Sequence, residues 1–252
     1  NISQADLTNH AANTANAATN ITITGALTHT DAATILGNTN SGTTTLASVT
    51  GTSAQLAALT VGDATITAVT GSDNATADQI TTILGFTTPS AYSLADSAAN
   101  LVALPSSTLN GATNLVSNTE ATVAQATVLD AATNSGTTTF GITDAAANIV
   151  GASDALLGSD SNGKIEISDA NITAAVATSL TAQDTAAAGY TIHDGGNAGV
   201  FVLSDTHANL TATANATAVA ASTSVTVTDT LTVAQGVTLE AAATADTSPA
   251  YS

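Results

Sequence analysis

The chain repeats itself, and this repetition constrains the fold more than any other feature of the sequence. The heptapeptide TNSGTTT occurs at 39–45 and again at 133–139. Related phrases include YSLADSAANL from Tyr92, IEISDANI from Ile165 and VLSDTHANL from Val202. The ends of the β-branched runs mark repeats of about 25 residues. These boundaries lie near Gln4, His29, Gly51, Gly71, Asp96, Asn118, Asp144, Asp169, Asp205 and Thr228.

Each repeat divides into two elements. The first is a run of alternating β-branched residues, such as NITIT at 20–24, DATITAV at 63–69 and SVTVT at 224–228, and a period of two is typical of strands. The second begins with Asp, Asn, Thr or Ser and continues as an Ala-rich segment with Leu, Ile or Val at helical spacing. We interpret the recurring Asp as a helix cap, because a carboxylate there accepts hydrogen bonds from the first turn of the helix.

The predicted fold class is an α/β repeat, because no repeat can bury its apolar face alone. Specifically, the pattern predicts a parallel β/α solenoid of about 25 residues per rung, with one strand and one Ala-rich helix or turn in each rung. We expect residues 1–252 to form a single continuous solenoid segment of a longer array. The surplus segment YTIHDGGNAGVFVL at 190–203 predicts an inserted hairpin or an extra rung.

The two ends of the chain lack the polar caps that terminate a repeat array. SPAYS at 248–252 matches PSAYS at 89–93, so the last residues read as the start of another repeat. This favours continuation of the same array or self-association end to end.

The charge balance excludes several classes of partner. Lys164 is the single Lys or Arg, against 19 Asp and Glu, and the formal net charge is -18. We therefore expect no binding to nucleic acid or to anionic membranes. No apolar run approaches the ~20 residues of a membrane span, so none is predicted. The absence of Cys excludes disulfides and thiol chemistry.

The inventory of reactive side chains predicts a protein that is not an enzyme and has no cofactor. The four histidines, His10, His29, His193 and His207, each stand apart from any second residue at a metal-ligand spacing. His193 and Asp194 are neighbours, but adjacent residues of a strand point to opposite faces. No Ser lies in a G-x-S-x-G setting.

One acidic segment, GSDSNGKIEISD at 158–169, has the residue types of a calcium loop. Asp160, Asn162 and Glu166 surround a glycine turn, and Ca²⁺ prefers such oxygen ligands. The segment lacks the closing bidentate Glu of a calcium loop. Both a calcium site and a plain polar turn therefore stay open. Glycans also stay open, since N-x-S/T occurs at Asn1, Asn20, Asn74, Asn171, Asn209 and Asn215.

The phrases YSLADSAANL, GATNLV, ATVAQATVLDAATNSGTTT and ITDAAANIVGASDALL resemble tandem repeats of very large proteins of aquatic bacteria, including cyanobacteria and proteobacteria. Those proteins are secreted or attached to the cell surface. The resemblance covers nearly the whole chain and implies a cell-surface role of the S-layer, adhesin or filament type. The GGxGxD nonapeptides of calcium-binding repeats, which accompany some of these proteins, do not occur here.

The sequence therefore predicts a structural module of a bacterial extracellular rod, filament, sheath or surface layer. An adhesin or phage-fibre spacer is the alternative, in which a binding tip lies outside this sequence. A third interpretation is an ice-binding solenoid, because Thr alternates along NITIT and SVTVT and would form ladders on one face of a parallel sheet.

Overall fold

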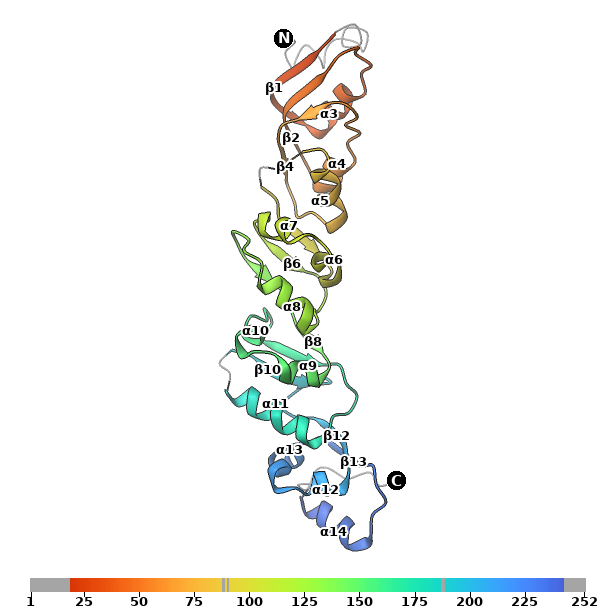
Figure 1. The fold of residues 1–252 in the computed structure, drawn as a ribbon, viewed down its shortest axis with the longest axis vertical. Helices are drawn as coiled ribbons and strands as arrows, with labels where there is room; N and C mark the ends of the chain where they lie inside the picture. The colour runs from red at the N-terminus through yellow and green to blue at the C-terminus, as the bar shows by residue number, and fades with distance from the viewer. Residues whose placement is uncertain (1–18, 88, 90, 187–188, 243–252) are drawn as a thin grey trace. The chain divides into compact units, whose positions relative to one another are not determined.

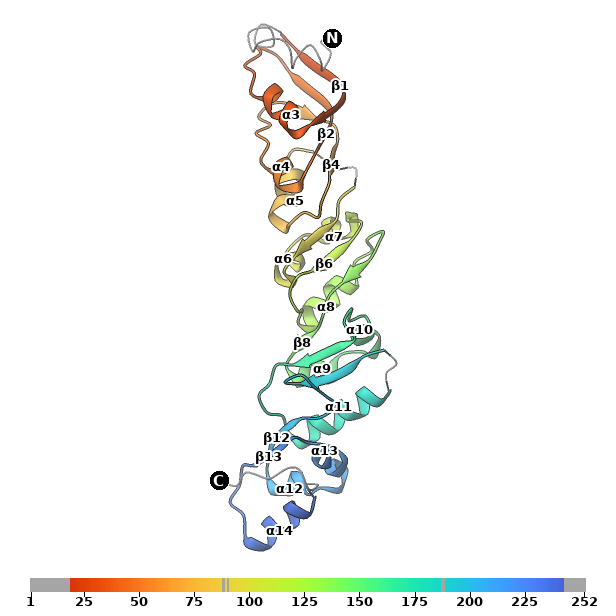
Figure 2. The ribbon, with the colours of Figure 1, turned by 180° about the vertical axis from the view of Figure 1, so that it is seen from behind.

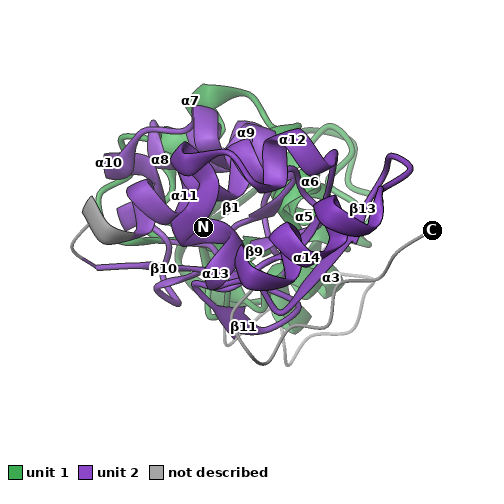
Figure 3. Cartoon of the chain, turned by 90° about the horizontal axis from the view of Figure 1, so that it is seen from below, with its two compact units in different colours: residues 1–118, 132–138 green, residues 119–131, 139–252 purple. Residues whose placement is uncertain are grey.

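The computed structural model describes residues 19–87, 89, 91–186 and 189–242. His10 and the SPAYS segment at 248–252 lie outside the described residues. The chain divides into two compact units, residues 1–118 with 132–138 and residues 119–131 with 139–252 (Figure 3).

The first unit contains a sheet in which β1 and β2 run parallel, side by side, and β3 and β4 pair with successive parts of β2 (Figures 1 and 2). A second sheet has the order β5-β6-β7, and β5 and β6 are parallel. The elements are β1 (Ile21–Thr28), α3 (His29–Leu36), β2 (Thr44–Gly51), α4 (Ser53–Ala57), β3 (Thr65–Ile66), β4 (Val69–Gly71), α5 (Ala77–Leu84), β5 (Leu94–Asp96), α6 (Ala98–Val102), α7 (Ser106–Gly111), β6 (Leu115–Ser117) and β7 (Thr138–Thr139).

The second unit contains a sheet of order β11-β10-β9-β8 and a pair β12-β13. These strands are parallel except β11, which runs antiparallel to β10. The elements are α8 (Val123–Asp130), β8 (Thr143–Asp144), α9 (Ala146–Gly151), α10 (Asp154–Gly158), β9 (Lys164–Ile167), α11 (Ala174–Ala186), β10 (Thr191–Asp194), β11 (Asn197–Ala198), β12 (Val202–Asp205), α12 (His207–Leu210), a 3-10 turn (Thr213–Asn215), α13 (Ala216–Ala220), β13 (Ser224–Val227) and α14 (Val233–Ala242).

Apolar side chains meet in register inside the first sheet because alternate residues of a strand face the same side. Two rows cross it, Ile23–Leu46–Ile66 and Leu27–Val49–Val69. None of these six residues is more than 3% exposed. Burial of each such side chain stabilises the fold by about 1.5–3 kcal/mol, so the paired rows explain why successive strands align.

The two TNSGTTT segments fold in the same way. In the second copy, Asn134 Nδ2 donates to Thr113 O (3.1 Å), and Asn114 Oδ1 accepts from Thr137 N (2.9 Å). A Cβ on Gly136 would lie 2.5 Å from Thr113 O, so this position requires glycine. The first copy has the equivalent pairs Asn40–Thr19 (3.3 Å) and Asn20–Thr43 (2.9 Å). The heptapeptide therefore recurs because it binds a Thr-Asn dipeptide of the preceding repeat.

The predicted solenoid, with one strand and one helix in each rung, is wrong. Within the described residues, the strands form four separate small sheets, and two helices follow one another after β5 and again after β8. Between sheets, the pairing is reduced to isolated bridges, Thr70–Ala91, Ala75–Leu94, Ala121–Ile142 and Ile172–Leu203. At the last three, the first bridge residue has a polar turn before it, GSDN at 71–74, SNTE at 117–120 or SDAN at 168–171, and a Thr directly after it. One residue is left to pair before the helix begins.

Candidate functional site

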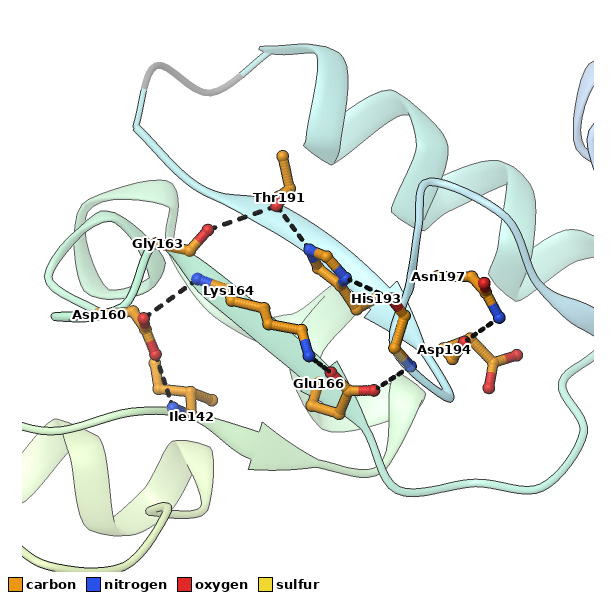
Figure 4. Close-up of polar contacts among 10 residues, drawn as sticks. Ile142, Asp160, Gly163, Lys164, Glu166, Thr191, His193, Asp194 and Asn197 are labelled. Atoms are coloured by element: carbon orange, nitrogen blue, oxygen red, sulfur yellow. Dashed lines mark hydrogen bonds and ion pairs between the residues drawn. The ribbon is translucent and has the colours of Figure 1, made fainter.

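Asp160, the first of the three predicted calcium ligands, accepts hydrogen bonds from backbone amides. It is 7% exposed. Its Oδ1 accepts from Asn162 N (2.8 Å). Figure 4 shows the other two contacts, in which Oδ1 accepts from Lys164 N (3.2 Å) and Oδ2 accepts from Ile142 N (2.6 Å). Three N–H donors already compensate the carboxylate, which fixes the turn between α10 and β9.

Glu166 lies farther along β9 and has different partners. Its Oε2 is 3.0 Å from Lys164 Nζ, and its Oε1 accepts from Gly196 N (2.7 Å) (Figure 4). Burial alone would raise the pKa of Glu166, but the hydrogen bonds from Lys164 and Gly196 outweigh burial and lower the pKa below its usual value. The structure thus gives the two carboxylates different donor groups, and Lys164 contributes its backbone N–H to Asp160 and its Nζ to Glu166.

His193 and Asp194 face different surroundings, although they are adjacent. The Nε2 of His193 lies 2.8 Å from Thr191 Oγ1, on the neighbouring position of the same face (Figure 4). Asp194 is 8% exposed, and its Oδ2 accepts from Val202 N (2.8 Å). Across the described ranges, no group of three or more His, Asp or Glu side chains is placed to hold a metal ion. The third predicted ligand, Asn162, lies beside Gly141.

The recurring Asp has a partner that the sequence analysis missed. Thr122 caps its own helix, α8, since its Oγ1 accepts from Gln125 N while Gln125 Oε1 accepts from Thr122 N. Asp144, one repeat later, accepts from Val123 N, the first amide of the same helix (2.8 Å). The interpretation of the Asp as the cap of the helix after it is therefore wrong. The contact recurs in the pairs Asp73–Ser53, Asp96–Ala77, Asp144–Val123, Asp169–Ala146, Asp205–Ala174 and Asp229–His207.

The second carboxylate oxygen of Asp144 fixes the side chain. This oxygen, Oδ1, accepts from Ala145 N (2.7 Å) and Asn148 Nδ2 (2.9 Å). Burial alone would raise the pKa of Asp144, but the hydrogen bonds from Asn148, Val123 and Ala145 outweigh it and lower the pKa. The same Asp-to-Asn bond, four residues apart, occurs in the pairs Asp96–Asn100 (2.9 Å) and Asp205–Asn209 (2.7 Å).

Three hydrogen bonds together form what we call the Asp clasp. A receiving triplet, Ala121–Thr122–Val123, binds an inserting strand, Ile142–Thr143–Asp144. Ala121 N donates to Gly141 O (2.8 Å), Ala121 O accepts from Thr143 N (3.0 Å), and Val123 N donates to the Asp144 carboxylate. Ile142 is fully buried. The other clasps join 75–77 to 94–96 and 172–174 to 203–205, with Leu94 and Leu203 buried in the same place.

The sequence signal for the clasp is a pair of spacings. Receiving triplets contain the Thr of T-x-x-Q at Thr76 and Thr122, and inserting strands end in D-x-x-x-N at Asp96, Asp144 and Asp205. T-x-x-Q also occurs at Thr52, where the Asp partner, Asp73, has no Asn four residues later. The third receiving triplet has Thr173 without the Gln. Both signals are local, but neither says which helix the Asp will reach, because the two partners lie 19 to 31 residues apart.

Comparison with known proteins gives no relative: no family model, curated protein or solved structure matches the chain. Within the ranges that the structure describes, none of the helices combines the length and the hydrophobicity that a membrane-spanning segment needs. The candidate site of this chain is therefore the repeated contact between neighbouring segments.

Proposed function

We propose that the chain is a structural repeat module of a bacterial extracellular filament, sheath or surface layer. The observation that carries this proposal is that Asp carboxylates bind backbone amides of the preceding repeat. Six Asp side chains bind the first amide of a helix one repeat earlier, so they join repeats to one another. Acidic groups of an enzyme or a metal site would instead converge on a shared space.

The scarcity of Lys and Arg supports an extracellular location, because it leaves the trypsin-like proteases found there a single cleavage position. That residue, Lys164, begins β9, where Thr191 N donates to the adjacent Gly163 O (2.9 Å). A protease must bind its substrate in an extended form, so the paired segment has to open first.

An adhesin or phage-fibre spacer is the runner-up, because the same contacts would serve a segment that only separates a binding tip from its anchor. Glycan-array binding by the chain itself would argue against a spacer. A lectin-like or receptor-binding domain next to this repeat in a longer protein would favour it.

Ice binding is a third candidate, supported by one feature of the first sheet. Thr28, Thr50 and Thr70 are Cα partners on β1, β2 and β4, and all three are exposed. The bridge partner of Thr70 beyond β4 is Ala91, so this ladder spans three strands. An ice-recrystallisation assay at micromolar protein concentration tests this candidate directly.

Labelling of intact cells tests the favoured proposal. Antibodies raised against the purified chain, applied to source cells without permeabilisation, are expected to label the surface or fibres attached to it. Antibodies against a cytoplasmic protein provide the control. Label that appears only after permeabilisation would contradict the extracellular role.

A further inference from the structure

The chain contains one more receiving triplet, Leu231–Thr232–Val233, whose last residue is the first residue of α14. The sequence TVAQ is identical at 122–125 and 232–235. The capping box is also formed in both copies, since Thr232 N donates to Gln235 Oε1 (2.9 Å) and Gln235 N donates to Thr232 Oγ1 (3.3 Å). This triplet is thus built like the one that binds Asp144.

The two copies differ in what covers them. Val123 is half-buried and its amide binds the Asp144 carboxylate. Val233 is 88% exposed, and Val237, one turn later, is 64% exposed. In the described part of the chain, no hydrogen bond reaches the backbone of Leu231 or the amide of Val233.

A hollow of about 390 Å³ lies at this triplet. Leu231, Val233 and Val237 line it, together with Val227 at the end of β13 and Gly236 of α14. In the filled clasps, the place ahead of the inserting Asp is taken by Leu94, Ile142 or Leu203, each fully buried. The hollow therefore offers apolar surface where those clasps hold an apolar side chain.

We propose that Leu231–Thr232–Val233 is the open receiving site for one further repeat, joined in line with this chain. This inference rests on the proposed structural function and specifies the contact through which one repeat joins the next. The inserting strand carries an apolar residue, any residue, and Asp, with Asn four residues after the Asp. Its apolar side chain fills the hollow, its backbone pairs with Leu231, and its carboxylate binds the Val233 amide.

Continuity with the filled clasps argues for a repeat rather than an unrelated ligand. Of the other T-x-x-Q helices, those after Thr76 and Thr122 are bound by the D-x-x-x-N strands that end at Asp96 and Asp144. The helix after Thr52 is bound by Asp73, which has no Asn four residues later. Because TVAQ at 232–235 is identical to TVAQ at 122–125, we expect its partner to be a D-x-x-x-N strand as well. Asp229 and Glu240 lie at the same hollow. Because like charges repel, an occupant with a single carboxylate, placed on an N–H donor, suits it better than a polyacidic one.

A fusion tests the site in the full chain. A copy of 94–118 is added directly after Ser252, which recreates the sequence YSLADSAANL present from Tyr92. Amide hydrogen exchange of Val233 and Leu231 is followed by NMR, with Val123 as internal reference. Because a hydrogen bond to a charged group is strong, the fusion is expected to slow Val233 exchange at least about tenfold.

A matched fusion in which the added copy has Asn at the position of Asp96 separates the two contacts. It is expected to slow Leu231, which pairs with backbone, while Val233 regains most of its rate. The proposal is overturned if neither fusion slows Val233, or if Val233 of the unmodified chain already exchanges as slowly as Val123. Protection that rises with protein concentration would also overturn it, since the insert would then come from another molecule. None of these outcomes depends on surface labelling.

Discussion

Replacement of Asp144 by Asn should weaken a contact that lies one repeat away in sequence. Asn retains one oxygen, which can serve either Ala145 N or Val123 N, while its NH2 group then faces the other N–H donor. One hydrogen bond to a charged group is lost, and such bonds contribute about 1.5–3 kcal/mol. Because Asp144 is partly exposed, we expect the free energy of unfolding to fall by about 1.5 kcal/mol, the lower end of this range.

Two measurements check this expectation at pH 7. Urea denaturation followed by far-UV circular dichroism gives the free energy of unfolding. Hydrogen exchange gives the protection of the Val123 amide, 21 residues before the substitution. Asp130→Asn is the control, because it removes the same charge from the exposed end of α8. A carboxylate at a helix C-terminus is unfavourable, so the control should be neutral or stabilising by a few tenths of a kcal/mol.

The pH dependence has a definite sign. Since the folded-state pKa of Asp144 lies below its ordinary 3.8, its stabilisation is complete above that value and is lost as pH falls through the lowered folded-state pKa. The stability gap between the wild type and Asp144→Asn should therefore close in acid. Equal stabilities at pH 7, or unchanged exchange of Val123 in the variant, would refute the clasp.

Three further perturbations address other contacts. Gly136→Ala should lower stability by about 1–3 kcal/mol, because its Cβ meets Thr113 O, whereas Gly151→Ala enters open space and should not destabilise; thermal denaturation compares them, and equal losses would contradict the close approach. Trypsin should leave the native chain intact and cut it once, after Lys164, when urea opens β9; equally rapid cutting of the native chain would argue against a closed strand. Burial and the neighbouring Asp154 raise the pKa of Tyr190 to about 12, so absorbance titration at 295 nm should contain a component there that Tyr190→Phe removes.

Local patterns were sufficient to predict the strands but not their division into sheets. The alternation in NITIT correctly places Ile21 and Ile23 inside, with Thr22 exposed between them. Where the sheets break, the deciding residues are polar turns such as GSDN at 71–74, which read only as ordinary loops. Such a turn ends the sheet only where a Thr-capped helix begins soon after it. The turn and the helix then leave a single residue between them that can pair with the next strand.

The role of the acidic side chains was harder to predict, because it depends on partners distant in sequence. Asp144 is followed by a helix, so capping of that helix was the simplest local interpretation. Its partner in the structure, Val123 N, becomes available only after the backbone has returned by a whole repeat. For Asp160, the sequence did predict a polar turn as an alternative, but the bond to Ile142 N, 18 residues earlier, has no local signal.

The direction of the Asp clasp has a consequence for synthesis. Six of the described helices obtain the partner of their first amide from residues 19 to 31 positions later. A ribosome makes the chain from its N-terminus, so the newest repeat is always the unfinished one. Each of these contacts can therefore form only after the next repeat has been made. In a nascent chain that stalls, the last such helix exposes a first amide that has no Asp partner.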